Sequence, residues 1–216
     1  MTGYTDYFAR KSLNAATGQD GVVPTWVALF TAVGVDAGTG FTEVTGGSYA
    51  RVSTSTSTWN AATGSAPSTI SNALAITFPT ASASWGTIIA WGLYDAATAG
   101  NLIAWDYMGN FNWLPATVSL ASPGVITSPA HGYSVGDTVI FSTEYGGVAP
   151  SFSASNFTGQ LVLAHAATDT FDVTNASTAV NTSSTGDGSV RKILPTVVGT
   201  GATPSYGSGA LALYCT

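Results

Sequence analysis

The chain has 216 residues, which is long enough for one large β domain or two small ones around a buried core. Only 7% of its residues are charged, whereas 45% are hydrophobic and 11% are aromatic, so the composition excludes an intrinsically disordered chain. We expect a surface covered by neutral Ser, Thr, Asn and Gly residues. Interfaces usually exclude Lys and Glu from their centres, so this surface fits a subunit that packs against copies of itself or a scaffold. The alternative is a secreted or environmental β protein with a neutral coat.

The net charge and the cysteine count limit the kinds of partner and of metal or disulfide site that we expect for this chain. Five Lys and Arg residues against eleven Asp and Glu residues give a net charge of −6. The only adjacent basic pairs are Arg10-Lys11 and Arg191-Lys192, so we expect no nucleic-acid partner. The single cysteine, Cys215, excludes an intrachain disulfide and metal sites with several cysteines. No signal-peptide core and no membrane-spanning run is present, so we expect a soluble protein made in a cytosol, with no membrane partner.

The first predicted element is a short N-terminal helix. Thr5 can cap it, and Tyr4 and Phe8 lie four residues apart, as they would on one helix face. The segment is either an arm packed on its own domain or a helix that docks on a partner. Because terminal arms often become ordered on docking, Tyr4, Tyr7 and Phe8 are candidate contacts with a capsid or another partner.

Strands with a two-residue period follow the N-terminal segment. In "VPTWVALFTA", Ala28 and Phe30 lie on one face and Val27 and Leu29 on the other, so both faces of this strand can be buried. "ISNALAITFPT", "WGTIIAWGLYD" and "GNLIAWDYMGNFNWL" continue the pattern, and "YDAATAGN" is predicted to be a hairpin connection. Short strands bounded by turns predict an all-β fold, here a jelly-roll-like β-sandwich.

The composition and the strand pattern of the sequence change near Pro115. "GVITSPAHGYSVGDTVIFST" is predicted to be a strand, a turn and a strand, "GQLVLAHAATDTFDVTNA" repeats that arrangement, and "TGDGSVRKI" supplies a last strand. The C-terminal "ALALYCT" fits a strand that completes the first sheet. We therefore predict a parent sandwich domain of residues 1–117 and 193–216, with a small β-module inserted at 118–192.

The two histidines raise the question of catalysis. His131 lies six residues before Asp137, and His165 also precedes aspartates, Asp169 and Asp172. No G-x-S-x-G motif, paired catalytic carboxylates or HExxH motif accompanies them. We therefore predict that both histidines belong to turns and that the chain has no catalytic residue. We expect no cofactor and no metal site, although the sequence leaves open whether loop carboxylates hold a metal ion.

The aromatic residues raise the question of sugar binding. Trp85, Trp91 and Trp105 lie in strongly apolar strands and are predicted to pack in the core. Trp59 ends "SYARVSTSTSTW", which is predicted to be an exposed polar strand, so this tryptophan is a candidate surface contact.

Arg51 is one of only five basic residues and follows two turn glycines in "GGSYAR". We expect its side chain to be partly buried and to pair with Glu43 across a hairpin.

Several segments resemble a family of small phage virion proteins, usually labelled tail-fibre proteins and similar in size to head decoration proteins. The resemblance rests on "WVALFTA", "AGTGFTEVTGGSYAR", "ITFPTASASWGTIIAWGLYDAATAGNLIAW" and the C-terminal "ATPSYGSGALAL". Ala99 stands where the family pattern commonly has a glycine. The inserted segment resembles a small β-repeat of phage structural proteins through "HGYSVGDTVIF" and "DTFDVT".

This resemblance implies a non-enzymatic structural protein of the virion, made in the host cytoplasm. The first expectation is a head decoration (cement) protein that binds the major capsid protein as a homotrimer and stabilises the assembled head. The alternative is a tail fibre or adaptor component that contacts a host glycan through Trp59, Tyr133, Tyr145 and Phe152. The sequence has no long repeats or heptads of the kind that trimerise many tail fibres, which favours the first expectation.

Overall fold

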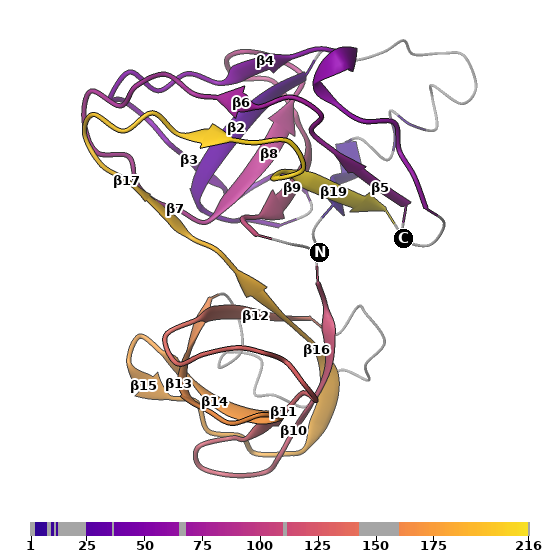
Figure 1. Ribbon diagram of the computed structural model, residues 1–216, viewed down its shortest axis with the longest axis vertical. Helices are drawn as coiled ribbons and strands as arrows, with labels where there is room; N and C mark the ends of the chain where they lie inside the picture. Colours follow the sequence, from indigo (N-terminus) through magenta and orange to yellow (C-terminus); the bar gives the residue numbers. More distant parts are fainter. Residues whose placement is uncertain are drawn as a thin grey trace. The chain divides into compact units, whose positions relative to one another are not determined.

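The structure is a computed structural model, and it describes residues 3–7, 10, 12, 25–35, 37–64, 68–109, 112–142 and 160–215. The chain forms two compact units: the split unit, Met1–Gly109 with Leu194–Thr216, and the barrel unit, Asn110–Ile193 (Figure 1). Nearly all regular elements are β-strands, which confirms the all-β class. No helix among the described residues is long and apolar enough to cross a membrane.

The split unit is built on a six-stranded antiparallel sheet in the order β1-β9-β8-β2-β3, with β4 also paired to β2. Its central strand buries both faces, as the sequence predicts. Val27 and Leu29 face one apolar cluster, and Ala28 and Phe30 face a second cluster on the opposite side. The strands of this sheet are β1 (Gly3–Tyr4), β2 (Thr25–Ala32), β3 (Thr42–Glu43), β4 (Val52–Thr54), β8 (Ala90–Tyr94) and β9 (Leu102–Tyr107).

Three two-stranded ladders, not a second continuous sheet, complete the split unit. Each ladder takes one strand from the C-terminal segment, so the prediction that this segment completes the first sheet is wrong. Glycines and Pro204 interrupt residues 199–209, which divides the segment into short strands that pair separately. The ladders are β5 (Ser68–Ser71) with β19 (Ala212–Cys215), β6 (Ile76–Thr77) with β18 (Ser205–Tyr206), and β7 (Gly86–Ile88) with β17 (Thr196–Val198).

The barrel unit closes six antiparallel strands into a ring in the order β11-β10-β16-β12-β13-β14, and β14 pairs back to β11 (Figure 1). Alternate residues such as Leu161, Leu163, Phe171 and Val173 fill its interior, as expected for a small barrel. The strands are β10 (Leu114–Val118), β11 (Ile126–Thr127), β12 (Thr138–Ser142), β13 (Leu161–Ala166), β14 (Thr170–Asn175) and β16 (Gly186–Ile193), with β15 (Thr178–Ala179) on the edge of β14.

The structure corrects two details of the predicted insertion. The barrel unit begins at Asn110, not at 118, because β10 pairs with β16 along its whole length, from Leu114 opposite Val190 to Val118 opposite Gly186. The strands β11 and β12 do not form the predicted hairpin. They lie on opposite sides of the ring, since β11 pairs with β10 and β14 whereas β12 pairs with β13 and β16. Local sequence signals locate strands but do not assign their neighbours.

The closed ring leads to a prediction about excision. The chain enters the barrel unit through β10 and leaves it through β16, and these two strands are paired. In the split unit, Leu194 N donates to Met108 O at 2.9 Å. We expect residues 110–193 to fold alone, and we expect the chain with a short Gly-Ser linker in their place to keep the split-unit fold. Circular dichroism melting and NMR peak dispersion of both proteins test this. An isolated barrel unit without a cooperative transition would contradict the prediction.

Candidate functional site

Arg51 is the centre of a polar cluster in the split unit. Its Nε and Nη2 donate to Oε1 and Oε2 of Glu43 at 2.8 and 2.6 Å, so the predicted ion pair is present and bidentate. Only 7% of the Arg51 side chain and 22% of the Glu43 side chain is exposed. The Arg51 Nη1 donates to the carbonyls of Ala96 and Ala99 at 2.8 and 2.7 Å, and the guanidinium lies 3.4 Å from the Tyr94 ring centroid. The cluster therefore fixes the β8–β9 connection to β3.

Tyr49 connects this cluster to the central strand. Its hydroxyl donates to Glu43 Oε1 at 2.9 Å and accepts from Leu29 N at 2.9 Å. Burial, and then the negative charge of Glu43, raise the pKa of Tyr49 far above its usual value. The phenol therefore stays neutral and keeps donating to the carboxylate.

Asp95 extends the polar cluster toward the N-terminal segment. Its Oδ1 accepts from Asn101 N at 2.7 Å, and its Oδ2 accepts from Asn101 Nδ2 and the Tyr7 hydroxyl, both at 2.8 Å. Partial burial acts to raise the pKa of Asp95, but these hydrogen bonds outweigh it and hold the pKa below its usual range. Asp95 thus joins the N-terminal segment to the β8–β9 connection.

The candidate N-terminal contacts are placed differently from one another. The backbone of Tyr4 pairs with Ala104 in the main sheet, and the Tyr7 hydroxyl bonds to Asp95. Phe8 lies outside the described residues. The described part of this segment is therefore packed on the split unit, which is the first of the two alternatives from the sequence.

Thr5, the expected side-chain cap, also lies against the main sheet. It is buried, and its hydroxyl lies 2.6 Å from Leu102 O and 3.0 Å from Ile103 O, so it bonds the segment to β9. The described residues with helical backbone after it are Asp6, Tyr7, Arg10 and Ser12.

Left-handed backbone explains the glycines of "GGSYAR". Gly46 and Gly47 have φ of 72° and 55°, and a Cβ on Gly47 would lie 2.8 Å from Nε1 of Trp85, which donates to Gly47 O at 3.0 Å. Ala99 also has a positive φ, 51°, at the position where the resemblance expects glycine. An alanine in this conformation costs roughly 1–2 kcal/mol, so the polar cluster holds a turn that its own sequence disfavours.

Asn72 is a structural residue that the sequence did not single out. Its side chain is fully buried, and Nδ2 donates to the carbonyls of Leu74, Tyr206 and Gly207 at 2.8, 3.2 and 2.8 Å. Its Oδ1 accepts from Leu211 N at 2.9 Å. Asn72 therefore fastens the C-terminal segment to the loop after β5. The available signal was one carboxamide within the apolar pattern of "ISNALAI".

Trp59 is half-buried and packs against the main core of the split unit. Its ring stacks on Trp91 with centroids 6.1 Å apart and planes at 20°. The predicted long exposed strand is short in the structure, because β4 ends at Thr54 and the 3₁₀ turn η1 (Thr56–Thr58) follows. This correction weakens the reading of Trp59 as a surface contact.

The family comparison concerns the unit just described. Residues 3–112, just over half of the chain, match a family described as podophage GP4 fiber I protein gp80. The chain belongs to this family. It is therefore a virion-associated structural protein of a phage, which is the general class of protein that the resemblance implied. The family match ends within the first residues of the barrel unit, which begins at Asn110. No curated protein matches the chain.

The barrel unit, which lies almost wholly beyond the family match, contains both histidines. His131 is buried, its Nδ1 accepts from Tyr133 N at 2.9 Å, and its ring packs 5.0 Å from Phe171. Asp137 has a separate partner, since its Oδ2 accepts from Ser134 N at 2.9 Å. The spacing in "HGYSVGD" therefore serves a turn, as predicted.

The candidate receptor contacts of the barrel unit are only partly described. Tyr133 is half-buried, and its ring packs 5.9 Å from Phe171 as part of the barrel core. Tyr145 and Phe152 lie outside the described residues. The described aromatic candidate thus supports the barrel core.

His165 and Asp172 form the pair that the structure does bring together. The Nδ1 of His165 lies 2.9 and 2.8 Å from the two carboxylate oxygens, and its backbone N donates to Oδ1 at 2.8 Å. His165 lies on β13 next to a β-bulge, not in the expected turn, and 84% of its side chain is exposed. It borders a cavity of about 200 Å³ that Val125 and Phe171 also line. Among the described residues, no three His, Cys, Asp or Glu side chains are grouped to hold a metal ion.

An acid-sensitive ion pair is expected at Asp137. Its Oδ1 lies 2.8 Å from Lys192 Nζ. Burial acts to raise the pKa of Asp137. The hydrogen bonds from Lys192 and from the Ser134 amide, together with the charge of Lys192, outweigh burial and lower this pKa overall. Since the folded pKa is below the unfolded value of about 3.9, the carboxylate stabilises the fold above that pH, and this contribution is lost as the pH falls through the folded pKa. We expect Lys192→Gln to cost under about 1 kcal/mol at neutral pH and to reduce the acid sensitivity of barrel unfolding. Urea unfolding at pH 7 and pH 3 measures this, and equal pH dependence in both proteins would contradict it.

Proposed function

We propose that the protein is a non-enzymatic structural subunit of the phage particle that joins a symmetric assembly through its split unit. The observation that carries this proposal is the family match, because it covers the part of the chain that holds the main sheet and the Arg51 cluster. The neutral surface supports it, since only 7% of the residues are charged and few charges need to be desolvated in a subunit interface.

Two locations in the particle fit such a subunit. The description of the family favours a fibre or an adaptor close to one. The sequence favours a head decoration protein, because its 216 residues contain no long repeat or heptad. As a decoration protein, most simply a homotrimer, it would bind the assembled lattice of the major capsid protein. It would stabilise the head by the free energy of the added contacts.

The copy number per particle distinguishes these locations. Quantitative mass spectrometry of purified particles gives the ratio of this protein to the major capsid protein. About one copy per capsid subunit supports a decoration protein, whereas a few copies per particle support a fibre or adaptor. A protein absent from purified particles would overturn both.

The N-terminal segment remains a candidate for the contact with the particle. Deleting residues 1–20 would also remove β1, so it cannot separate attachment from folding. Tyr7→Phe is a sharper change, because it removes the hydroxyl bond to Asp95 and keeps the ring. If this hydroxyl only anchors the segment, we expect a loss of stability of about 1 kcal/mol and unchanged incorporation into particles. Incorporation that falls while the melting temperature is unchanged would instead indicate a direct contact.

A further inference from the structure

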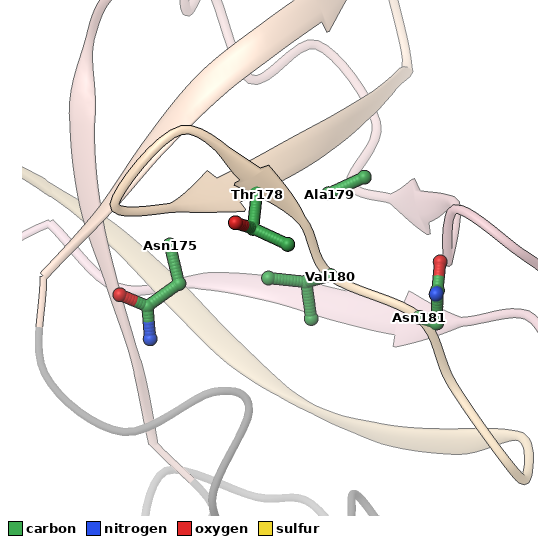
Figure 2. Close-up of a pocket in the computed structure, with 5 residues that line it drawn as sticks. All are labelled: Asn175, Thr178, Ala179, Val180 and Asn181. Atoms are coloured by element: carbon green, nitrogen blue, oxygen red, sulfur yellow. The ribbon is translucent and has the colours of Figure 1, made fainter.

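The β14–β15 hairpin of the barrel unit borders a cavity of about 270 Å³, which lies beyond the residues of the family match (Figure 2). Asn175 and Thr178 face each other across the hairpin, so their side chains lie on the same face. Figure 2 shows the Thr178 and Val180 side chains extending toward Asn175. Among the described residues, the lining is Asn175, Thr178, Ala179, Val180 and Asn181.

The turn that shapes the cavity has an unusual backbone. Ala176 and Ser177 connect the two strands with φ of 47° and 66°, where hairpins of this kind prefer Asn and Gly. Residues with side chains are disfavoured in this region and persist only where the surrounding structure holds them. The hairpin is therefore held in one conformation, with Asn175 and Thr178 side by side.

The other wall of the cavity is also held by hydrogen bonds. Val180 N donates to Val173 O at 3.1 Å, and Gly124 N donates to Val180 O at 2.9 Å. The Oδ1 of Asn181 accepts from Ser122 Oγ at 2.8 Å. The wall is thus connected to β14 on one side and to the loop after β10 on the other. A ligand would meet a preformed site and would cost little ordering of the protein.

The chemistry of the lining defines the class of ligand. It combines two carboxamides and a hydroxyl, which both donate and accept hydrogen bonds, with the methyl group of Ala179 and the edge of Val180, a barrel-core residue that is 4% exposed. A pyranose ring is complementary to this set, because its neutral hydroxyls surround an apolar C–H face. None of the described lining residues is charged, so an anionic sugar or a phosphate would find no cationic partner among them. We infer that this cavity binds one neutral sugar ring, such as a residue of a surface polysaccharide.

The affinity follows from the size of the site. A cavity that contacts a single ring is expected to bind a free monosaccharide with a Kd on the order of 1 mM. Several copies in one assembly would bind a repetitive polysaccharide more tightly through avidity. That gain rests on the proposed function, whereas binding at the single site does not. A measurement on the isolated chain therefore tests the site independently of the assembly.

NMR titration of the ¹⁵N-labelled full-length chain tests the inference, with the methyl glycosides of glucose, galactose and N-acetylglucosamine as probes. At least one probe is expected to shift amide signals in residues 173–182 with saturation. Asn175→Ala and Thr178→Val are each expected to weaken that binding about tenfold, the effect of losing one ligand hydrogen bond. Thr178→Ser keeps the hydroxyl and should retain binding. Thr117→Val changes an exposed threonine on β10 and should have no effect.

Three results would overturn the inference. The first is the lack of a saturable shift at residues 173–182 with all three probes. The second is a shift that persists unchanged in Asn175→Ala and Thr178→Val, provided that both variants show the dispersed spectrum of a folded barrel unit. The third is equal or tighter binding of N-acetylneuraminic acid, which is anionic, or of an extended peptide along β15. Either ligand would place a different chemistry at this hairpin.

Discussion

Replacing Arg51 by alanine is expected to lower the unfolding free energy of the split unit by about 3–5 kcal/mol, the usual cost of breaking a buried ion pair. The change would leave the Glu43 carboxylate without its bidentate partner and the carbonyls of Ala96 and Ala99 without their donor. The β8–β9 connection, which includes the left-handed Ala99, would lose the group that holds it. Urea unfolding followed by tryptophan fluorescence measures the loss, because five of the six tryptophans, all except Trp113, lie in the split unit.

A double-mutant cycle separates the free energy of the Glu43–Arg51 interaction from that of the other contacts of each residue. Glu43→Ala and Arg51→Ala each remove one half of the same ion pair. The double variant is therefore expected to lose clearly less stability than the sum of the two single losses. Arg51→Lys keeps the charge but cannot form the two parallel bonds to Glu43, and an intermediate loss is expected. A loss below about 1 kcal/mol for Arg51→Ala would show that the pair behaves like an exposed salt bridge, contrary to this account.

Replacing Asn72 by alanine is expected to cost a similar amount, about 3–4 kcal/mol, because each unsatisfied buried polar group costs about 1–3 kcal/mol. The carbonyls of Leu74, Tyr206 and Gly207 and the amide of Leu211 would lose the hydrogen bond to the Asn72 side chain. The Gly207 carbonyl keeps a second donor, Ala210 N. The C-terminal segment is expected to detach locally before the main sheet unfolds. Hydrogen exchange of the amides in residues 205–214 measures this step, and the melting temperature measures the overall loss.

Asn60 offers a matched control for that experiment. Its exposed carboxamide donates to Ser71 Oγ at 3.1 Å, so Asn60→Ala removes the same chemical group near the same strand. We expect a loss of about 0.5 kcal/mol or less. Equal losses in the two variants would contradict the role assigned to Asn72.

The features that were predictable from the sequence have local causes. Residue periodicity alone gives the two buried faces of β2, and the turn residues in "YDAATAGN" mark the connection between β8 and β9. The Glu43–Arg51 pair was predictable because the two residues are close in sequence and charges are rare in this chain.

The features that were not predictable depend on distant pairing. Ring closure joins β11 to β14, which lie far apart in the sequence, and no residue in either strand marks the other as its neighbour. Asn72 bonds to residues more than 130 positions away, so its role emerges only in the folded chain. Trp59 follows a Ser- and Thr-rich segment, which indicates exposure, but the stacking on Trp91 decides its burial. The β14–β15 cavity depends on the left-handed turn, and the sequence "NAST" gives no sign of it.

The closed ring of the barrel unit has a consequence for crowding. Subunits held side by side on one particle reach high local concentrations, where unpaired strand edges tend to aggregate. Each of the six ring strands has a neighbour on both sides, and the strand added at the edge, β15, has only two residues. In the split unit, by contrast, β17 pairs only with β7 among the described strands, and 74% of Val197 is exposed on it. Barrel units can therefore be packed densely without joining through their edges, so edge-to-edge association is left to the split unit.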